Sequence, residues 1–132
     1  MDNSMKKNIG KADLLRMMKK NMDGEVKTIT FYLDNLENLN YSKNTKHVEA
    51  LVLDSVTHLG NLCKAFMSLH ADIPAKQPIP SHLRELALTE EKGLREIYQF
   101  MLQHSNNAEI NKTFEQLVEA ERTHEKMVRE LK

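Results

Sequence analysis

The placement of proline divides this chain more firmly than any other feature of its sequence. All three prolines, Pro74, Pro78 and Pro80, fall within seven residues near the middle of the 132-residue chain. Proline lacks a backbone N–H and breaks helices and sheet ladders alike, so this stretch is a connection between two halves. Asparagine-rich breaks at about 38–44 and 104–107 divide each half again. Four segments remain, at about 13–39, 45–69, 82–103 and 109–131.

The four segments share a helical pattern. Each is rich in Leu, Met, Glu and Lys, which favour helix, and each repeats apolar residues at steps of three and four. In the second segment the stripe runs through Val48, Leu51, Leu62 and Leu69. Four amphipathic helices in a chain of this length predict an all-α four-helix bundle over residues 13–132, preceded by a flexible N-terminus at residues 1–12.

The two halves resemble each other at an offset of 66 residues. Ten identities occur over the 34 positions 25–58, where unrelated windows would give roughly two. They include Glu25 with Glu91 and His58 with His124. The sequence therefore predicts a duplicated helical hairpin.

Five polar residues interrupt the apolar stripes where a plain bundle would carry leucine. They are Glu25, His58, Glu91, Glu121 and His124. An ionised carboxylate taken out of water costs several kcal/mol unless it is paired or bound to a metal. Residues at one level of an antiparallel hairpin are equidistant from its turn, and turns centred near residues 41 and 107 bring all five polar residues to one layer. We expect these five residues to be metal ligands.

A structural interpretation stands beside the metal-binding one. A lone histidine on an apolar face is more often a hydrogen-bonded core residue than a ligand, and Tyr32 and Tyr98 supply volume that any bundle core needs. The remaining glutamates of the last segment, Glu125 among them, are assigned to a solvated face.

The polar pattern resembles the ferritin-like superfamily, and its rubrerythrin-type branch most closely. The resemblance rests on Glu25 with Tyr32 seven residues later, Glu91 with Tyr98 seven later, and the run from Glu121 to His124. Such proteins hold two iron or manganese ions in a four-helix bundle with a long crossover between helices two and three. The resemblance implies that Glu25 and Glu91 are terminal ligands, His58 and His124 nitrogen ligands and Glu121 a bridging carboxylate. It implies that Tyr32 and Tyr98 orient the carboxylates.

One expected ligand is missing. Where the second helix of the family carries Glu-x-x-His, this chain has Ser55 three residues before His58. Asp54 is adjacent, but one residue is about 100° of helix rotation, which turns it largely away from Glu121. Three carboxylates leave one positive charge on two divalent cations. A hydroxide, an outside anion or Asp54 could supply the missing negative charge. Otherwise the site holds a single ion or no longer binds tightly, and the pattern does not choose among iron, manganese and zinc.

Charge and composition narrow the classes of function. Nineteen Lys and Arg balance nineteen Asp and Glu. The chain therefore lacks the excess of basic residues that is typical of a nucleic-acid binder. No stretch approaches the roughly 20 apolar residues of a membrane span, so we expect a cytoplasmic protein. The single cysteine, Cys63, allows neither an internal disulfide nor the four-cysteine iron centre of a complete rubrerythrin. Electrons for a redox reaction would come from a separate donor protein.

Two functional hypotheses follow. The first is a diiron or degenerate diiron protein that acts as an oxidoreductase on peroxide or oxygen, or handles iron. The alternative is a non-enzymatic helical module for dimerisation or protein interaction that has lost the full metal site. We expect a homodimer in either case.

Overall fold

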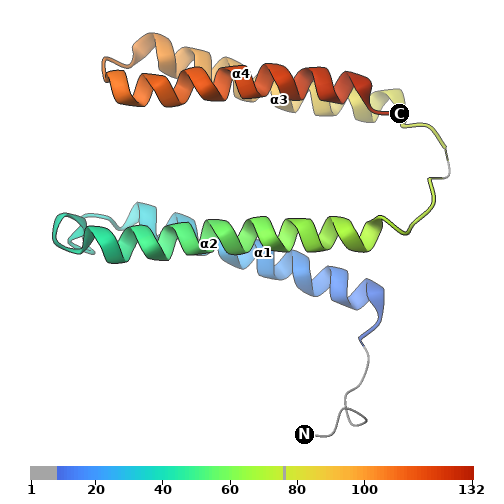
Figure 1. The fold of residues 1–132 in the computed structure, drawn as a ribbon, viewed down its shortest axis with the longest axis horizontal. Helices are drawn as coiled ribbons and strands as arrows, with labels where there is room; N and C mark the ends of the chain where they lie inside the picture. Colours follow the sequence, from blue (N-terminus) through green and yellow to red (C-terminus); the bar gives the residue numbers. More distant parts are fainter. Residues whose placement is uncertain (1–8, 76) are drawn as a thin grey trace, which may run out of the picture. The chain divides into compact units, whose positions relative to one another are not determined.

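The structure, a computed structural model, describes residues 9–75 and 77–132, and within these ranges all regular secondary structure is α-helical. The all-α prediction is thereby confirmed. The helices are α1 (Lys11–Asp34), α2 (Tyr41–His70), α3 (Ser81–His104) and α4 (Ala108–Glu130). Figure 1 shows them in chain order from blue to red.

The helix boundaries depart from prediction around the first turn. The first helix was expected to reach residue 39, but α1 ends at Asp34. The chain turns over residues 35–40 and enters α2 through Asn40, whose φ of 51° and ψ of 52° lie in the left-handed region that asparagine tolerates. Asn44, inside α2, has φ of −121° and marks a local kink. The asparagines explain why the helices break near residue 40, but their presence alone does not determine the residue at which α1 ends.

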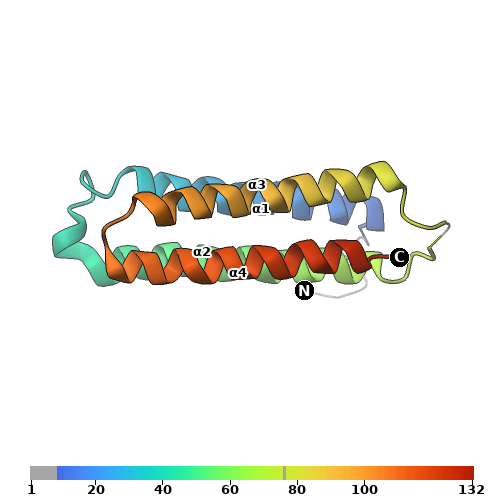
Figure 2. The same ribbon diagram turned by 90° about the horizontal axis from the view of Figure 1, so that it is seen from above.

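Hairpin 1 consists of α1 and α2, which run antiparallel and side by side (Figures 1 and 2). Met18 and Val48 are its buried apolar residues, each under a tenth exposed. Cys63 Sγ lies 3.6 Å from Met22 Sδ across the seam. Large apolar side chains such as Phe31 remain more than half exposed. Two helices alone bury one seam and leave most of their apolar surface open.

Hairpin 2 consists of α3 and α4 and has the same antiparallel form (Figure 2). Val118 and Val128 are its buried apolar residues. The connecting turn ends with Asn107, whose side-chain oxygen accepts from the backbone N–H groups of Glu109 and Ile110 and caps α4. Arg84 closes the other end of α4 by donating to backbone oxygens near its C-terminus, those of Val128, Arg129 and Leu131.

The chain divides into two compact units between Pro74 and Ala75, so each hairpin is a unit by itself. Within the described ranges, no helix has an apolar stretch long enough to cross a membrane. Most of the expected flexible N-terminus, residues 1–8, lies outside the described residues, and α1 begins within the rest of it, at Lys11.

Candidate metal centre

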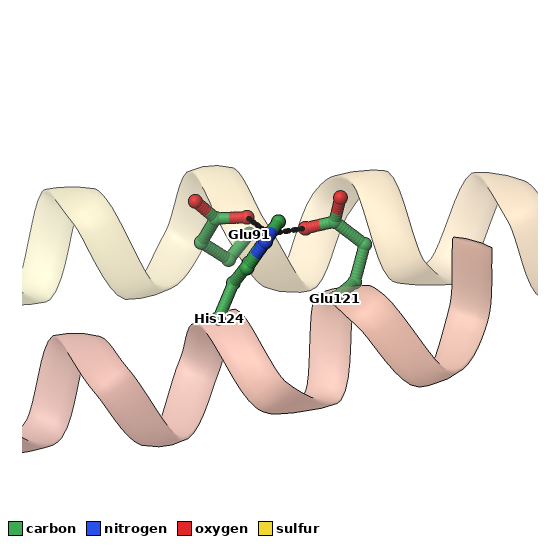
Figure 3. Close-up of side chains that lie close together, drawn as sticks. All are labelled: Glu91, Glu121 and His124. Carbon is green, nitrogen blue, oxygen red and sulfur yellow. Dashed lines mark hydrogen bonds and ion pairs between the residues drawn. The ribbon is translucent and has the colours of Figure 1, made fainter. Parts of the chain in front are cut away.

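Three of the five predicted ligands converge in hairpin 2 (Figure 3). Glu91 comes from the middle of α3, and Glu121 and His124 come from α4, one helical turn apart. His124 Nδ1 lies 3.3 Å from Glu91 Oε2 and 3.3 Å from Glu121 Oε2. Donor atoms of all three residues lie within 4.8 Å of one another.

These separations suit ligands of a single metal ion. Nitrogen and carboxylate oxygen bind zinc-like cations at about 2.0–2.2 Å. Two such donors on one ion are therefore about 2.8–3.6 Å apart when the angle between them is octahedral or tetrahedral. The two measured His124 distances fall within this interval.

The carboxylates and the imidazole shift each other's pKa. The hydrogen bond with the Glu121 carboxylate, burial, and the nearby negative charge of Glu121 all raise the pKa of Glu91. The neighbouring His124 lowers it and offsets this increase only in part. The same Glu121 carboxylate, helped by Glu91, raises the pKa of His124. Glu121 itself is 6% exposed. The cluster therefore favours an added positive charge, whether a proton or a metal ion.

Hairpin 1 brings together the other two predicted ligands. Glu25 Oε1 lies 3.5 Å from His58 Nδ1, the same pair that Glu91 and His124 form 66 residues later. Ser55, the counterpart of Glu121, is buried at 7% exposure. We call the side of hairpin 1 that carries Glu25 and His58 its front face. An open groove of about 660 Å³ lies there, lined by Lys20, Asn21, Gly24, Glu25, Thr28, His58, Asn61 and Leu62.

The other predicted site residues lie apart from these contacts. Tyr32 is half-buried, and its ring packs edge-to-face on that of Phe31 with the ring centroids 5.4 Å apart. Tyr98 packs against Phe114 with ring centroids 6.4 Å apart. Within residues 9–75 and 77–132, neither phenol hydrogen-bonds to a predicted ligand. Asp54 is exposed on α2.

Sequence reasoning missed an ion pair beside the cluster. Glu125 was assigned to the solvated face, and this was wrong, because it is 7% exposed and pairs with Arg95. Both residues follow a cluster residue by four positions, Arg95 after Glu91 and Glu125 after Glu121. That spacing places Arg95 and Glu125 on the same helix faces as the predicted ligands, with opposite charges. This pattern in the sequence could have predicted the ion pair.

Comparison with known proteins does not identify this chain: no protein-family model, curated protein or solved structure matches it.

Proposed function

We propose that this protein binds a divalent metal ion through Glu91, Glu121 and His124. The observation that supports it is the convergence of two carboxylates and one imidazole from two helices at separations suited to one ion. The donor set fits the ion's charge, because two carboxylates neutralise one divalent cation and the imidazole binds as a neutral ligand. Three protein ligands leave coordination positions open.

One ion fits the residues better than two. A second ion in the family pattern would require a carboxylate at Ser55, which offers only a hydroxyl. Oxygen and imidazole ligands suit iron, manganese or zinc. A bound iron or manganese ion would supply redox chemistry and an open position for an oxidant. Glu91, Glu121 and His124 would hold the ion, and the Arg95 ion pair would fix the next turn of both helices.

We infer that the two hairpins close front to front into a ferritin-like four-helix bundle. The 66-residue repeat supports this, since each hairpin carries a Glu–His contact at the same repeat position. The linker is consistent with the crossover. His58 lies about 18 Å from the end of α2 and Glu91 about 15 Å from the start of α3. Residues 71–80 span roughly 33 Å when fully extended, which equals the sum of these two lengths, so the crossover requires residues 71–73 to leave the turn that they form after α2.

The activity that this arrangement supports best is reduction of peroxide or oxygen, or handling of iron. Cys63 is the only cysteine, so electrons would be supplied by a separate donor protein. The proposed role of Tyr32 and Tyr98 is to orient the carboxylates once the bundle has closed.

Metal analysis tests the proposal. The protein, purified without chelator or affinity tag, is reconstituted with Fe²⁺, Mn²⁺ or Zn²⁺, and its bound metal is counted. We expect about one equivalent, lost in Glu121→Gln with His124→Gln, and a melting temperature raised by the metal only in the wild type. The matched control replaces two exposed residues outside the cluster, Glu115→Gln with His82→Gln, and should keep the metal. Fewer than about 0.2 equivalents of every metal in the wild type would contradict the proposal.

The same assay addresses the second candidate function, a helical dimerisation or protein-interaction module. Ser55 in place of the fourth carboxylate favours this alternative. A folded chain that binds none of the three metals supports it. Peroxide consumption by the Fe²⁺-loaded wild type, absent in the double cluster variant, would favour the redox activity instead.

A further inference from the structure

Hairpin 1 has a second groove, which lies near the turn between α1 and α2 and shares no lining residue with the groove on the front face. We call it the back groove, because Glu49 in its lining precedes His58 by nine positions, or about 180° of helix rotation. Its volume is about 440 Å³. Its lining consists of the polar residues Tyr41 and Glu49 and the apolar residues Leu33, Leu36, Val48, Val52 and Leu53.

The apolar lining of the back groove extends from the helix seam to the surface. Val48 is 5% exposed, and Leu36 and Val52 are half-buried. Leu33 on α1 and Leu53 on α2 are 53% and 60% exposed. The volume falls within the range of about 300–1,000 Å³ that is typical of small-molecule sites. Because a cavity of about 150 Å³ holds one benzene ring, the back groove has room for a ligand of roughly 10–18 non-hydrogen atoms.

Tyr41 and Glu49 form one polar contact in this apolar lining. The Tyr41 hydroxyl donates to Glu49 Oε1 at 2.9 Å. This hydrogen bond, burial and the charge of Glu49 raise the pKa of Tyr41, so the hydroxyl keeps its proton at neutral pH. Glu49 Oε2, the second oxygen of the carboxylate, can accept from a ligand as well. Among the described residues that line the groove, Glu49 is the only charged one, so a ligand there meets a single negative charge.

The repeat indicates that the lining of the back groove is not a requirement of the hairpin. Val48 corresponds to Phe114, a larger residue whose ring packs against Tyr98 with the centroids 6.4 Å apart. The counterparts of Leu33, Tyr41 and Leu53 are the polar residues Gln99, Asn107 and Glu119. Hairpin 1 therefore has a smaller residue at the seam and apolar residues beside it, at positions where a hairpin of the same form carries neither.

We propose that the back groove binds a small organic cation with an apolar body and a primary ammonium head. The apolar body lies between Leu33 and Leu53, and the ammonium group donates to Glu49. Charge complementarity identifies the head group, because the carboxylate repels an anion and holds a charged donor more strongly than a neutral one. Glu49 lies on the side of α2 away from His58, so this inference does not rest on the proposed metal site.

Three probes with similar apolar bodies and different head groups test the assignment. Phenylbutylamine, phenylbutanol and phenylbutyrate carry a positive, a neutral and a negative head at neutral pH. Each is titrated into the full-length protein, and the methyl resonances of leucine and valine are followed by NMR. We expect phenylbutylamine to bind with a dissociation constant of about 1 mM or below and to shift the resonances of Leu33, Val48 and Leu53. It should bind at least about fivefold more tightly than either of the other probes.

Substitutions at the groove separate the head group from the apolar body. Glu49→Gln removes the charge at constant size and should weaken phenylbutylamine at least about fivefold while leaving phenylbutanol unchanged. Leu33→Gln with Leu53→Gln changes two exposed apolar positions and should weaken all three probes. The matched control is Glu115→Gln, the counterpart of Glu49 on α4, and it should bind phenylbutylamine as the wild type does. Helical content by circular dichroism should stay at the wild-type value in every variant.

Several results would overturn the inference. They are a wild type that does not bind phenylbutylamine up to about 10 mM, equal or tighter binding of phenylbutanol or phenylbutyrate, and an affinity for phenylbutylamine that Glu49→Gln leaves unchanged or that Glu115→Gln weakens equally. All titrations use the metal-free protein. Their outcome is therefore independent of whether Glu91, Glu121 and His124 bind a metal ion, and failure of either proposal leaves the other standing.

Discussion

Arg95 and Glu125 form a two-pronged ion pair in hairpin 2, at the positions where hairpin 1 carries Ile29 and Leu59. Arg95 Nε donates to Glu125 Oε2 at 2.7 Å and Nη2 to Oε1 at 3.3 Å. Hairpin 1 thus carries half-buried apolar side chains at the two positions where hairpin 2 carries a charged pair. Beside the proposed metal centre, this ion pair joins α3 to α4 one turn beyond Glu91 and Glu121.

The first prediction concerns the cost of breaking this pair. Arg95→Ile should lower the melting temperature of the metal-free protein, because Glu125 is left in the seam without its counterion. The double replacement Arg95→Ile with Glu125→Leu copies hairpin 1 and should recover most of the loss. Thermal unfolding followed by circular dichroism measures both. A double variant no more stable than Arg95→Ile would show that the seam of hairpin 2 cannot accept the apolar pair.

The pair also makes stability depend on pH. The Arg95 guanidinium lowers the pKa of Glu125. A carboxyl whose pKa is lower in the folded state stabilises the fold above its unfolded pKa of about 4.5, and loses this contribution as pH falls through the folded value. If the wild type is more stable than the double variant at neutral pH, this difference in stability should therefore decrease in acid. Unfolding midpoints from pH 7 down to about 3 test this, and an advantage that grows in acid would contradict it.

A second titration concerns the proposed metal centre itself. Glu121 and Glu91 raise the pKa of His124 in the metal-free protein. The proton they stabilise competes with the metal, so the apparent affinity for Zn²⁺ should fall by up to about tenfold per pH unit below that pKa. In the metal-free protein, lowering the pH has the opposite effect on the fold. A histidine whose pKa is raised by folding stabilises the folded state at low pH, and this stabilisation is lost as pH rises through the folded pKa. NMR titration of His124 should show its pKa fall in Glu121→Gln, and an unchanged value would contradict the assigned contact.

Arg84 supports the fourth prediction. Its guanidinium donates to the backbone oxygens of Val128 at 2.9 Å and Arg129 at 2.8 Å, and to Leu131. These groups lie at the end of α4, where carbonyls lack the i+4 partner of a continuing helix and the helix dipole favours a cation. The Val128 oxygen also accepts from the Leu131 N–H at 3.3 Å. Arg84→Ala should cost about 1–3 kcal/mol in the free energy of unfolding. Arg122→Ala, which removes an exposed pair with Glu119, should cost less than about 1 kcal/mol. Equal costs would mean that the carbonyl contacts contribute nothing beyond a surface charge.

The sequence predicts local structure and local contacts better than side-chain burial. Helical periodicity and the three clustered prolines fix four helices, because these signals act within a few residues. Counting from the turns predicts that Glu91 and His124 lie level, and they are in contact. The burial of Glu125 was missed because its neighbours along α4 are charged, and charge alone does not reveal which way a side chain turns. The early end of α1 was missed because several asparagines near residue 40 can each stop a helix.

Ser55 stands where hairpin 2 carries Glu121, and this difference supports the last prediction. It is as buried as Glu121, its counterpart in hairpin 2. If the hairpins close as proposed, Ser55→Glu adds the fourth carboxylate, which neutralises a second divalent cation, and bound metal should rise from about one equivalent toward two. Without metal the added carboxylate should lower the melting temperature, and metal should restore it. Ser55→Gln has the same size without the charge and should stay at one equivalent. A folded Ser55→Glu protein that still binds one ion would show that Glu25 and His58 do not join Glu91, Glu121 and His124 in one site.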